Sequence, residues 1–380
     1  MADLIEEMRY INKDEDMYGT CDKAASICKY LELKNNKELL EKNNIIAIYG
    51  QWGSGKSCLM KNIEQDIDKT KFNTIWFDTW KYEKDDNLAV SLFKYIAKDN
   101  FVEKIKEKGN RFIRNAMGIL VSISKSVEFN VKDVITLKPG DGIKEAQEQQ
   151  EKYNEYLESN KPLWEKMQEF EDEFREIKFG GKKLVVFLDD LDRCESENII
   201  SLISSIKLLL SANPNIIFII GIDRDAVTLA LQNKYQNDYN KADEYLEKIF
   251  TINFEVPKQN NNDSIKKYIE EITDLEFSSC DLIMDFLKEI KFDNPRHIKK
   301  IFRKYYGMKN YLKENQIDVS NVAVVIFILY IIILANFQRE EYKNLFIEKR
   351  ANLYKDVMFK TISQNRYRDQ ICFFFSTEDY

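Results

Sequence analysis

The stretch YGQWGSGKSC, residues 49–58, carries glycines, a lysine and a serine at the spacing GxxxxGK followed by serine. In this pattern the glycines let backbone N–H groups turn toward phosphate oxygens, while the lysine reaches the outer phosphates and the serine binds magnesium. An apolar run precedes the stretch and a helical pattern follows it, as such a loop requires. The residues predicted to line this phosphate cradle are Gly50, Gln51, Trp52, Gly53, Ser54, Gly55, Lys56, Ser57 and Cys58.

A second stretch, KKLVVFLDDLDRC, places two carboxylates directly after an apolar run. Both should therefore stand at the carboxyl end of a buried strand. We expect Asp189 to hold magnesium together with Ser57, and Asp190 to orient or deprotonate an attacking water. Aspartates also form turns at strand ends, but beside a phosphate-binding loop that is the weaker interpretation.

Other polar residues near strand ends allow two interpretations each. Asp223 ends the run NIIFIIGID, where it is either a sensor of the γ-phosphate or a turn aspartate. Asp192 and Arg193 should face the γ-phosphate or a neighbouring subunit, and for Arg193 a structural or intersubunit role is favoured over a catalytic one. Trp80 and Tyr82 either wall a nucleotide pocket or pack in the core.

The elements that must position these residues alternate along the first two thirds of the chain. Five short apolar runs predict strands at 45–49, 73–77, 184–188, 216–220 and 251–256. Because helical patterns separate them, the strands should be parallel, with helices on both faces and ligands beyond their carboxyl ends. The run 73–77 lies between the two motifs in sequence, which leaves room for an inserted central strand as in the additional-strand ATPases.

Three parts are predicted from these patterns. Residues 1–99 and 181–260 form an α/β core, 100–180 a helical insertion, and 261–380 a helical C-terminal part, with 258–263 as the linker. The insertion carries one apolar seam, which is too short for a stable intermolecular coil and should pack on a neighbouring helix of the same insertion. The seam consists of Leu163, Met167, Phe170, Phe174 and Ile177.

The C-terminal part contains two informative segments. In DNPRHIKKIFRKYY, Asn294 and Pro295 are typical of a helix start. The predicted buried face of that helix is Ile298, Ile301, Phe302 and Tyr305. The second segment, 322–335, is wholly apolar but shorter than the roughly 18 to 20 residues that span a bilayer, which favours a buried helix over membrane insertion.

Composition excludes several classes of protein. A net charge of −7 and a pI near 5.3 argue against a nucleic-acid-coating protein, although a local basic patch is compatible with them. Six cysteines without a CxxC pair, and the single histidine His297, indicate a reduced cytosol and no structural zinc. The acidic start MADLIEEMRY lacks the features of a signal peptide, so a cytoplasmic protein is expected, with peripheral membrane association as the alternative.

Five segments taken together resemble the KAP family of P-loop NTPases over roughly residues 16–335. In chain order they are YGQWGSGKS, WFDTWKYEKDDNL, FLDDLDRC, YLEKIFTINFEVP and NPRHIKKIF. The resemblance implies an AAA+-like core that binds ATP or GTP, in a group that includes bacterial phage-exclusion proteins and membrane-associated signalling scaffolds. Many members carry transmembrane helices between the P-loop and the Walker B strand, whereas this chain has a charged stretch there.

The resemblance also assigns roles. In AAA+-like proteins the helical lid sends an arginine to the γ-phosphate, and Arg296 is the candidate by position, although its basic stripe is equally suited to a solvated face or a partner. We therefore expect an ATPase with ATP and Mg²⁺ as cofactors that works as a conformational switch. A homo-oligomer or a protein partner would contact the insertion and C-terminal helices. The alternatives are a binding module without functional turnover and, with less support, a small-molecule kinase.

Overall fold

The computed structural model describes residues 13, 16–85, 87–98, 112, 115–122, 162–232, 238–257, 262–316 and 319–343. Contacts between residues divide the chain into two compact units. The sheet unit contains the described residues from 20 to 257, and the helical unit contains residues 13 and 16–19 together with those from 262 onward.

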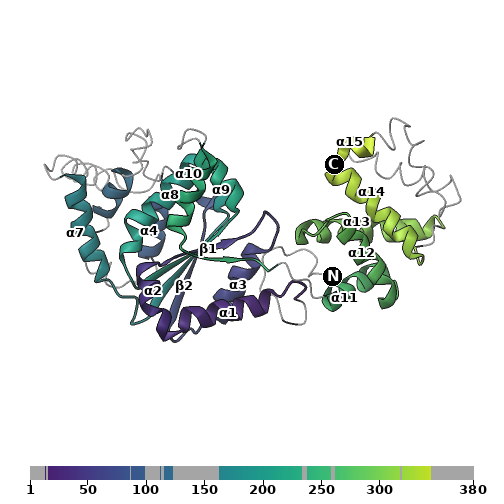
Figure 1. Ribbon diagram of the computed structural model, residues 1–380, viewed down its shortest axis with the longest axis horizontal. Helices are drawn as coiled ribbons and strands as arrows, with labels where there is room; N and C mark the ends of the chain where they lie inside the picture. Colours follow the sequence, from purple (N-terminus) through teal and green to yellow (C-terminus); the bar gives the residue numbers. More distant parts are fainter. Residues whose placement is uncertain are drawn as a thin grey trace, which may run out of the picture. The chain divides into compact units, whose positions relative to one another are not determined.

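The sheet unit is built on five parallel strands in the order β2-β3-β4-β1-β5. Their bounds are β1 (Ile45–Tyr49), β2 (Phe72–Asp78), β3 (Lys183–Asp189), β4 (Ile216–Ile222) and β5 (Ile252–Glu255). All five overlap the predicted runs. The strands β1, β3 and β4 are covered on both faces and therefore need nearly continuous apolar residues. The fold class, a parallel sheet with helices on both faces, is confirmed (Figure 1).

The position of β2 in the sheet corrects one expectation. The strand inserted between β1 and β3 is β4, whereas β2 pairs only with β3 and stands at the edge. Residues 73–77 therefore do not form the central strand. Chain order does not decide this, because helical crossovers can return the chain to either side of an existing strand. The arrangement still separates β1 from β3 by one strand, as expected for an additional-strand ATPase.

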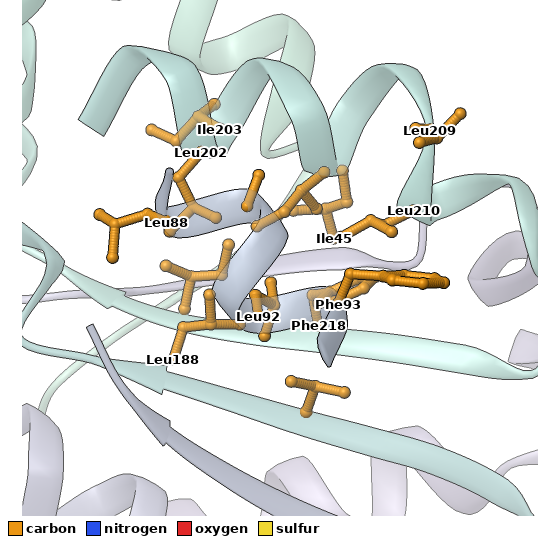
Figure 2. Close-up of a cluster of buried hydrophobic side chains, with 14 of the residues drawn as sticks. Ile45, Leu88, Leu92, Phe93, Leu188, Leu202, Ile203, Leu209, Leu210 and Phe218 are labelled. Carbon is orange, nitrogen blue, oxygen red and sulfur yellow. The ribbon is translucent and has the colours of Figure 1, made fainter. Parts of the chain in front are cut away.

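Successive strand residues point to opposite faces of the sheet, and their side chains pack in two separate hydrophobic cores, one on each face. One face carries Ile46 and Ile48 against α1 (Thr20–Glu32), α2 (Lys37–Lys42) and α3 (Lys56–Asp66). The opposite face carries Ile45, Leu188 and Phe218 beneath the remaining helices of the unit (Figure 2). Those helices are α4 (Leu88–Lys98), α7 (Leu163–Arg175), α8 (Ser196–Leu208), α9 (Arg224–Gln232) and α10 (Tyr239–Ile249).

The apolar seam of α7 packs within the chain, partly on Phe112 of the predicted insertion and partly on α4, which lies outside the insertion. Phe170 and Phe174 are buried and stack with each other at 5.3 Å between ring centroids. Phe112 stacks on Phe170 at 4.9 Å, and Phe93 of α4 completes the aromatic group. Leu163, at the start of the seam, is exposed. Residues 123–161 of the predicted insertion lie outside the described residues.

The helical unit has a core of its own. It contains α11 (Asn262–Thr273), α12 (Cys280–Glu289), α13 (Pro295–Glu314), α14 (Val322–Phe337) and α15 (Arg339–Tyr342). Asn294 caps α13 by accepting hydrogen bonds from the backbone N–H groups of Arg296 and His297, and the predicted face of this helix is buried. Met17 and Tyr18, which the sequence-based division assigns to the α/β core, pack against this cluster.

The apolar segment 322–335 forms most of α14. Eight of its side chains are buried, and seven of them, including Val325 and Ile328, belong to the core of the helical unit. At 16 residues α14 is too short to cross a bilayer, and no other helix of the described residues is long and apolar enough to do so. The prediction of a core helix is consistent with this packing.

Candidate functional site

The glycine-rich loop joins the carboxyl end of β1 to the start of α3. Gly55 has a φ of 102°, a backbone conformation that favours glycine, and α3 begins at Lys56 directly after it. The backbone N–H of Gly50 donates to the Ile222 carbonyl oxygen at 3.2 Å, which ties the loop to β4. A Cβ atom at Gly50 would lie 2.9 Å from the Val256 side chain, so no larger residue fits there. The loop has the shape of a phosphate cradle.

Lys56 is buried at the centre of the loop. Its Nζ donates to the Gly50 carbonyl oxygen at 2.9 Å and to the Gln51 carbonyl oxygen at 3.3 Å. The same ammonium forms an ion pair with Asp192 Oδ2 at 3.1 Å, and the side chains of both partners are less than a tenth exposed. The contact with Asp192 joins the two sequence motifs. Sequence reasoning placed Asp192 on a loop near the γ-phosphate but did not pair it with the lysine.

Asp189 ends β3 with its carboxylate in the protein interior. Its backbone carbonyl accepts hydrogen bonds from the N–H and hydroxyl groups of Thr79, which fix the strand end. Burial raises the pKa of the carboxyl group, while a hydrogen bond from the Ser57 hydroxyl and the charge of Lys56 lower it. Oδ2 is buried and has no hydrogen-bond partner. An orphaned carboxylate oxygen next to a serine hydroxyl fits a magnesium ion held by one carboxylate, one hydroxyl and phosphate oxygens.

Asp190 follows in the left-handed backbone region, with φ at 57°. This conformation begins the short helix η6 (Leu191–Arg193), and Arg193 Nε pairs back with Asp190 Oδ1 at 2.8 Å. Burial, followed by the charge of Asp189, raises the pKa of the Asp190 carboxyl group to about 6, against the opposing effect of Arg193. A carboxylate with this pKa is suited to accept a proton near neutral pH.

Asp223 is a turn aspartate that also contacts the phosphate loop, and its role as a sensor of the γ-phosphate stays a prediction. Its Oδ2 accepts a hydrogen bond from the backbone N–H of Trp52 at 3.2 Å, which connects it to the phosphate loop. Its Oδ1 accepts from the backbone N–H of Ala226 at 3.4 Å, at the start of α9, as a turn aspartate does. The residue therefore holds the shape of the loop from the neighbouring strand β4.

Some side chains of the segment after β2 pack in the core, and others lie at the surface. Tyr82 stacks on Phe77 at 4.7 Å between ring centroids, so it packs in the core. Trp80 is 55% exposed and lies 5.4 Å from the Arg193 guanidinium. Glu83, which sequence reasoning missed, accepts hydrogen bonds from the Glu195 backbone N–H at 2.8 Å and from the Asn198 side chain at 3.0 Å. It joins this segment to the start of α8; its only sequence signal was a position inside the motif WKYE.

The remaining predicted residues occupy less central places. Ser54 has a backbone N–H that donates to the Gln51 carbonyl oxygen at 3.1 Å, and its hydroxyl is buried without a partner. Gly53 has a φ of 79°, and Cys58 is half-buried in the first turn of α3. Arg296 lies in α13 of the helical unit, separate from the unit that holds the loop, so its contact with a γ-phosphate stays a prediction.

Fold and site together define a class of protein. A glycine-rich loop between β1 and α3, a buried aspartate at the end of β3, and a strand between β1 and β3 are the features of a P-loop NTPase of the additional-strand type. The model of the KAP family P-loop domain matches residues 24–312. The chain belongs to the KAP family.

Two relatives share part of this chain. An uncharacterised protein of Methanocaldococcus jannaschii, MJ0182, is 33% identical over an alignment that covers 38% of this chain and 88% of the relative. A second uncharacterised protein of the same organism, MJ0181, is 32% identical, and the alignment covers 26% of this chain and 46% of the relative. Neither name states a ligand or an activity.

Proposed function

We propose that the protein binds ATP with Mg²⁺, hydrolyses it slowly and uses the nucleotide as a conformational switch. One observation carries the proposal: the buried Lys56 at the start of α3 and the orphaned Oδ2 of Asp189 at the end of β3 belong to one site, in which the Ser57 hydroxyl donates to Asp189. A buried cation and a buried carboxylate beside a glycine-rich loop fit a nucleotide phosphate chain with its metal ion.

The roles of the residues follow from their chemistry. Lys56 would bind the β and γ oxygens, while Ser57 and Asp189 would hold Mg²⁺, which neutralises charge on the phosphates when bound. Asp190 would orient and deprotonate the attacking water. Its side chain is one methylene shorter than the glutamate that many ATPases have here, so it would hold the water less closely. Slow turnover is the expected result.

A switch also needs a part that responds. Nucleotide binding would close the helical C-terminal unit on the sheet unit, with Arg296 reaching the γ-phosphate, and hydrolysis would reset the protein. The partner would be a second copy or another protein that contacts the insertion and the C-terminal helices. A role in bacterial anti-phage defence or signalling rests on the family resemblance alone.

A different function would use the same site without turnover. In that case the protein is a scaffold module that binds ATP stably, and Asp190 is a structural turn residue. The left-handed backbone of Asp190 and its pairing with Arg193 suit this alternative, because both features hold a turn in place. Binding and turnover must therefore be tested separately.

Calorimetric titration with Mg-ATP tests binding. Lys56→Ala should cost about 2 to 4 kcal/mol of binding free energy, because it removes the main charge-assisted contact. A parallel titration with Mg-GTP shows whether the site prefers adenine or guanine nucleotides. An unchanged Mg-ATP affinity in Lys56→Ala would contradict the proposed role of this lysine in phosphate binding.

Single-turnover hydrolysis tests the switch. Asp190→Asn should keep Mg-ATP affinity but lose turnover by about 10² or more, the scale of a positioned general base. Light scattering should then detect a nucleotide-bound state that differs in size or mass from the free protein, since a ligand shifts an equilibrium only through different affinities for two states. Binding without turnover in the wild type, and identical mass with and without ATP, would favour the scaffold module.

A further inference from the structure

The ammonium group of Lys56 has no donor left for a phosphate. A lysine carries three N–H donors, and here three protein oxygens lie within hydrogen-bond distance. Two are neutral carbonyls of the loop, Gly50 O at 2.9 Å and Gln51 O at 3.3 Å, and the third is the carboxylate of Asp192 at 3.1 Å. A phosphate oxygen can reach Lys56 only if one of these acceptors leaves.

Asp192 is the acceptor that most resembles the incoming ligand. It is the anionic member of the three, and its side chain is only 5% exposed. Exchanging one anion for another keeps the charge of the buried ammonium compensated throughout, whereas leaving the ammonium without an anionic partner is unfavourable. The carboxylate of Asp192 thus occupies the chemical position of a phosphate oxygen.

The turn that presents Asp192 is held in place by its own neighbours. The backbone N–H of Arg193 donates to the Asp190 carbonyl oxygen at 3.2 Å, and Arg193 Nε pairs with Asp190 Oδ1. Leu191, the first residue of the turn, is fully buried in the core above the sheet. Asp192 therefore contacts Lys56 from a turn whose backbone is held by hydrogen bonds and by the buried Leu191.

We propose that Asp192 is an internal phosphate mimic that holds Lys56 in the nucleotide-free protein, so that a nucleotide binds only by displacing it. This inference rests on the proposed nucleotide binding and adds its regulation: the resting site is closed by the chain's own carboxylate. Compared with a protein that lacks the Asp192 carboxylate, the affinity for nucleotide is lower and the nucleotide-free fold is more stable.

Asp192→Asn tests the mimic through two quantities that should move in opposite directions. The affinity for Mg-ATP, measured by calorimetry, should rise about tenfold, the scale of one charge-assisted contact removed from competition. The melting temperature of the nucleotide-free protein should fall by about 2–4 °C, because Lys56 loses its buried partner. Asp192→Glu retains the charge and should stay close to the wild type in both.

Glu41→Gln is the matched control. Glu41 pairs with Lys183 at 3.8 Å in the same unit, and this substitution changes the net charge by the same amount as Asp192→Asn. It should leave Mg-ATP affinity unchanged, which separates a local contact from a general effect of negative charge.

Each other outcome overturns a different statement. Tighter binding with an unchanged or higher melting temperature would mean that Asp192 only repels phosphate and does not hold Lys56. Unchanged or weaker binding in a folded Asp192→Asn protein would contradict displacement altogether. If neither the wild type nor Asp192→Asn binds nucleotide, the proposed function fails, and a lowered melting temperature would then show only a structural ion pair.

Discussion

At the scale of single residues, Asp190 has an unfavourable setting for a negative charge. It is buried next to Asp189, with Asp78 and Asp192 close enough to raise its pKa further, and Arg193 is the cation that opposes them. The shift to about 6 means that the folded protein binds this proton more tightly than the unfolded chain. Its contribution to stability is therefore present at low pH and is lost as the pH rises through about 6.

The same shift predicts the pH dependence of hydrolysis. A general base works when ionised, so kcat/KM should fall on the acid side with a midpoint near pH 6, where an ordinary aspartate would give a midpoint near 4. Arg193→Met removes the stabilising cation and should move this midpoint to higher pH. A midpoint near 4, or one that Arg193→Met does not move, would exclude Asp190 as the base. Initial rates at low ATP concentration give the profile.

Single residues also show the limit of sequence reasoning. The spacing of the loop identified Lys56 and Ser57, since the chemistry of phosphate binding is tied to local order along the chain. The pairing of Lys56 with Asp192 joins positions 136 residues apart, and no local pattern encodes it. The hydrogen bond from Trp52 to Asp223 is likewise a product of β1 and β4 lying side by side.

At the scale of elements, local sequence patterns predict where the strands lie along the chain better than they predict the order of the strands in the sheet. The strands β1, β3 and β4 are nearly continuous apolar runs, and burial on both faces makes such runs visible in sequence. The order of the strands in the sheet depends on the helical crossovers. The sequences of these helices do not indicate beside which strand the next strand will pair. Residues 73–77 were thus recognised as a strand and assigned to the wrong place. Side-chain caps, by contrast, are local, and the start of α13 was predicted correctly.

The cap of α13 gives a prediction at the scale of one element. Asn294 accepts from two backbone N–H groups that have no partner within the helix. Asn294→Ala should therefore destabilise the helical unit by about 1 kcal/mol, measured by denaturant unfolding followed by circular dichroism. Asn310→Ala makes the same change at an exposed position inside α13 and should cause no loss. Equal effects of both substitutions would show that the cap contributes nothing.

At the scale of the whole molecule, the two units have separate cores. The cluster around α13 and α14 contains residues of the helical unit, and the two clusters on the sheet contain residues of the sheet unit. The Lys56 and Asp189 site belongs entirely to the sheet unit, whereas Arg296 belongs to the helical unit. Nucleotide binding and the proposed γ-phosphate contact can therefore be separated by damaging one core.

Val325→Asp provides that separation. Val325 is fully buried in α14, and an unpaired carboxylate there should cost at least about 3 kcal/mol, a large share of the roughly 5 to 15 kcal/mol that keeps a domain folded. We expect the variant to lose helical signal and one part of its thermal transition, to keep Mg-ATP binding in the sheet unit, and to lose hydrolysis because Arg296 is no longer presented.

Ala323→Asp is the control for this experiment. It places the same charge in the first turn of α14, where the helix N-terminus stabilises a carboxylate, and should leave fold, binding and hydrolysis intact. If Val325→Asp hydrolyses ATP at the wild-type rate while its helical unit is unfolded, Arg296 has no part in the reaction. If it loses nucleotide binding as well, the two units fold as one, and the switch cannot consist of one unit closing on the other.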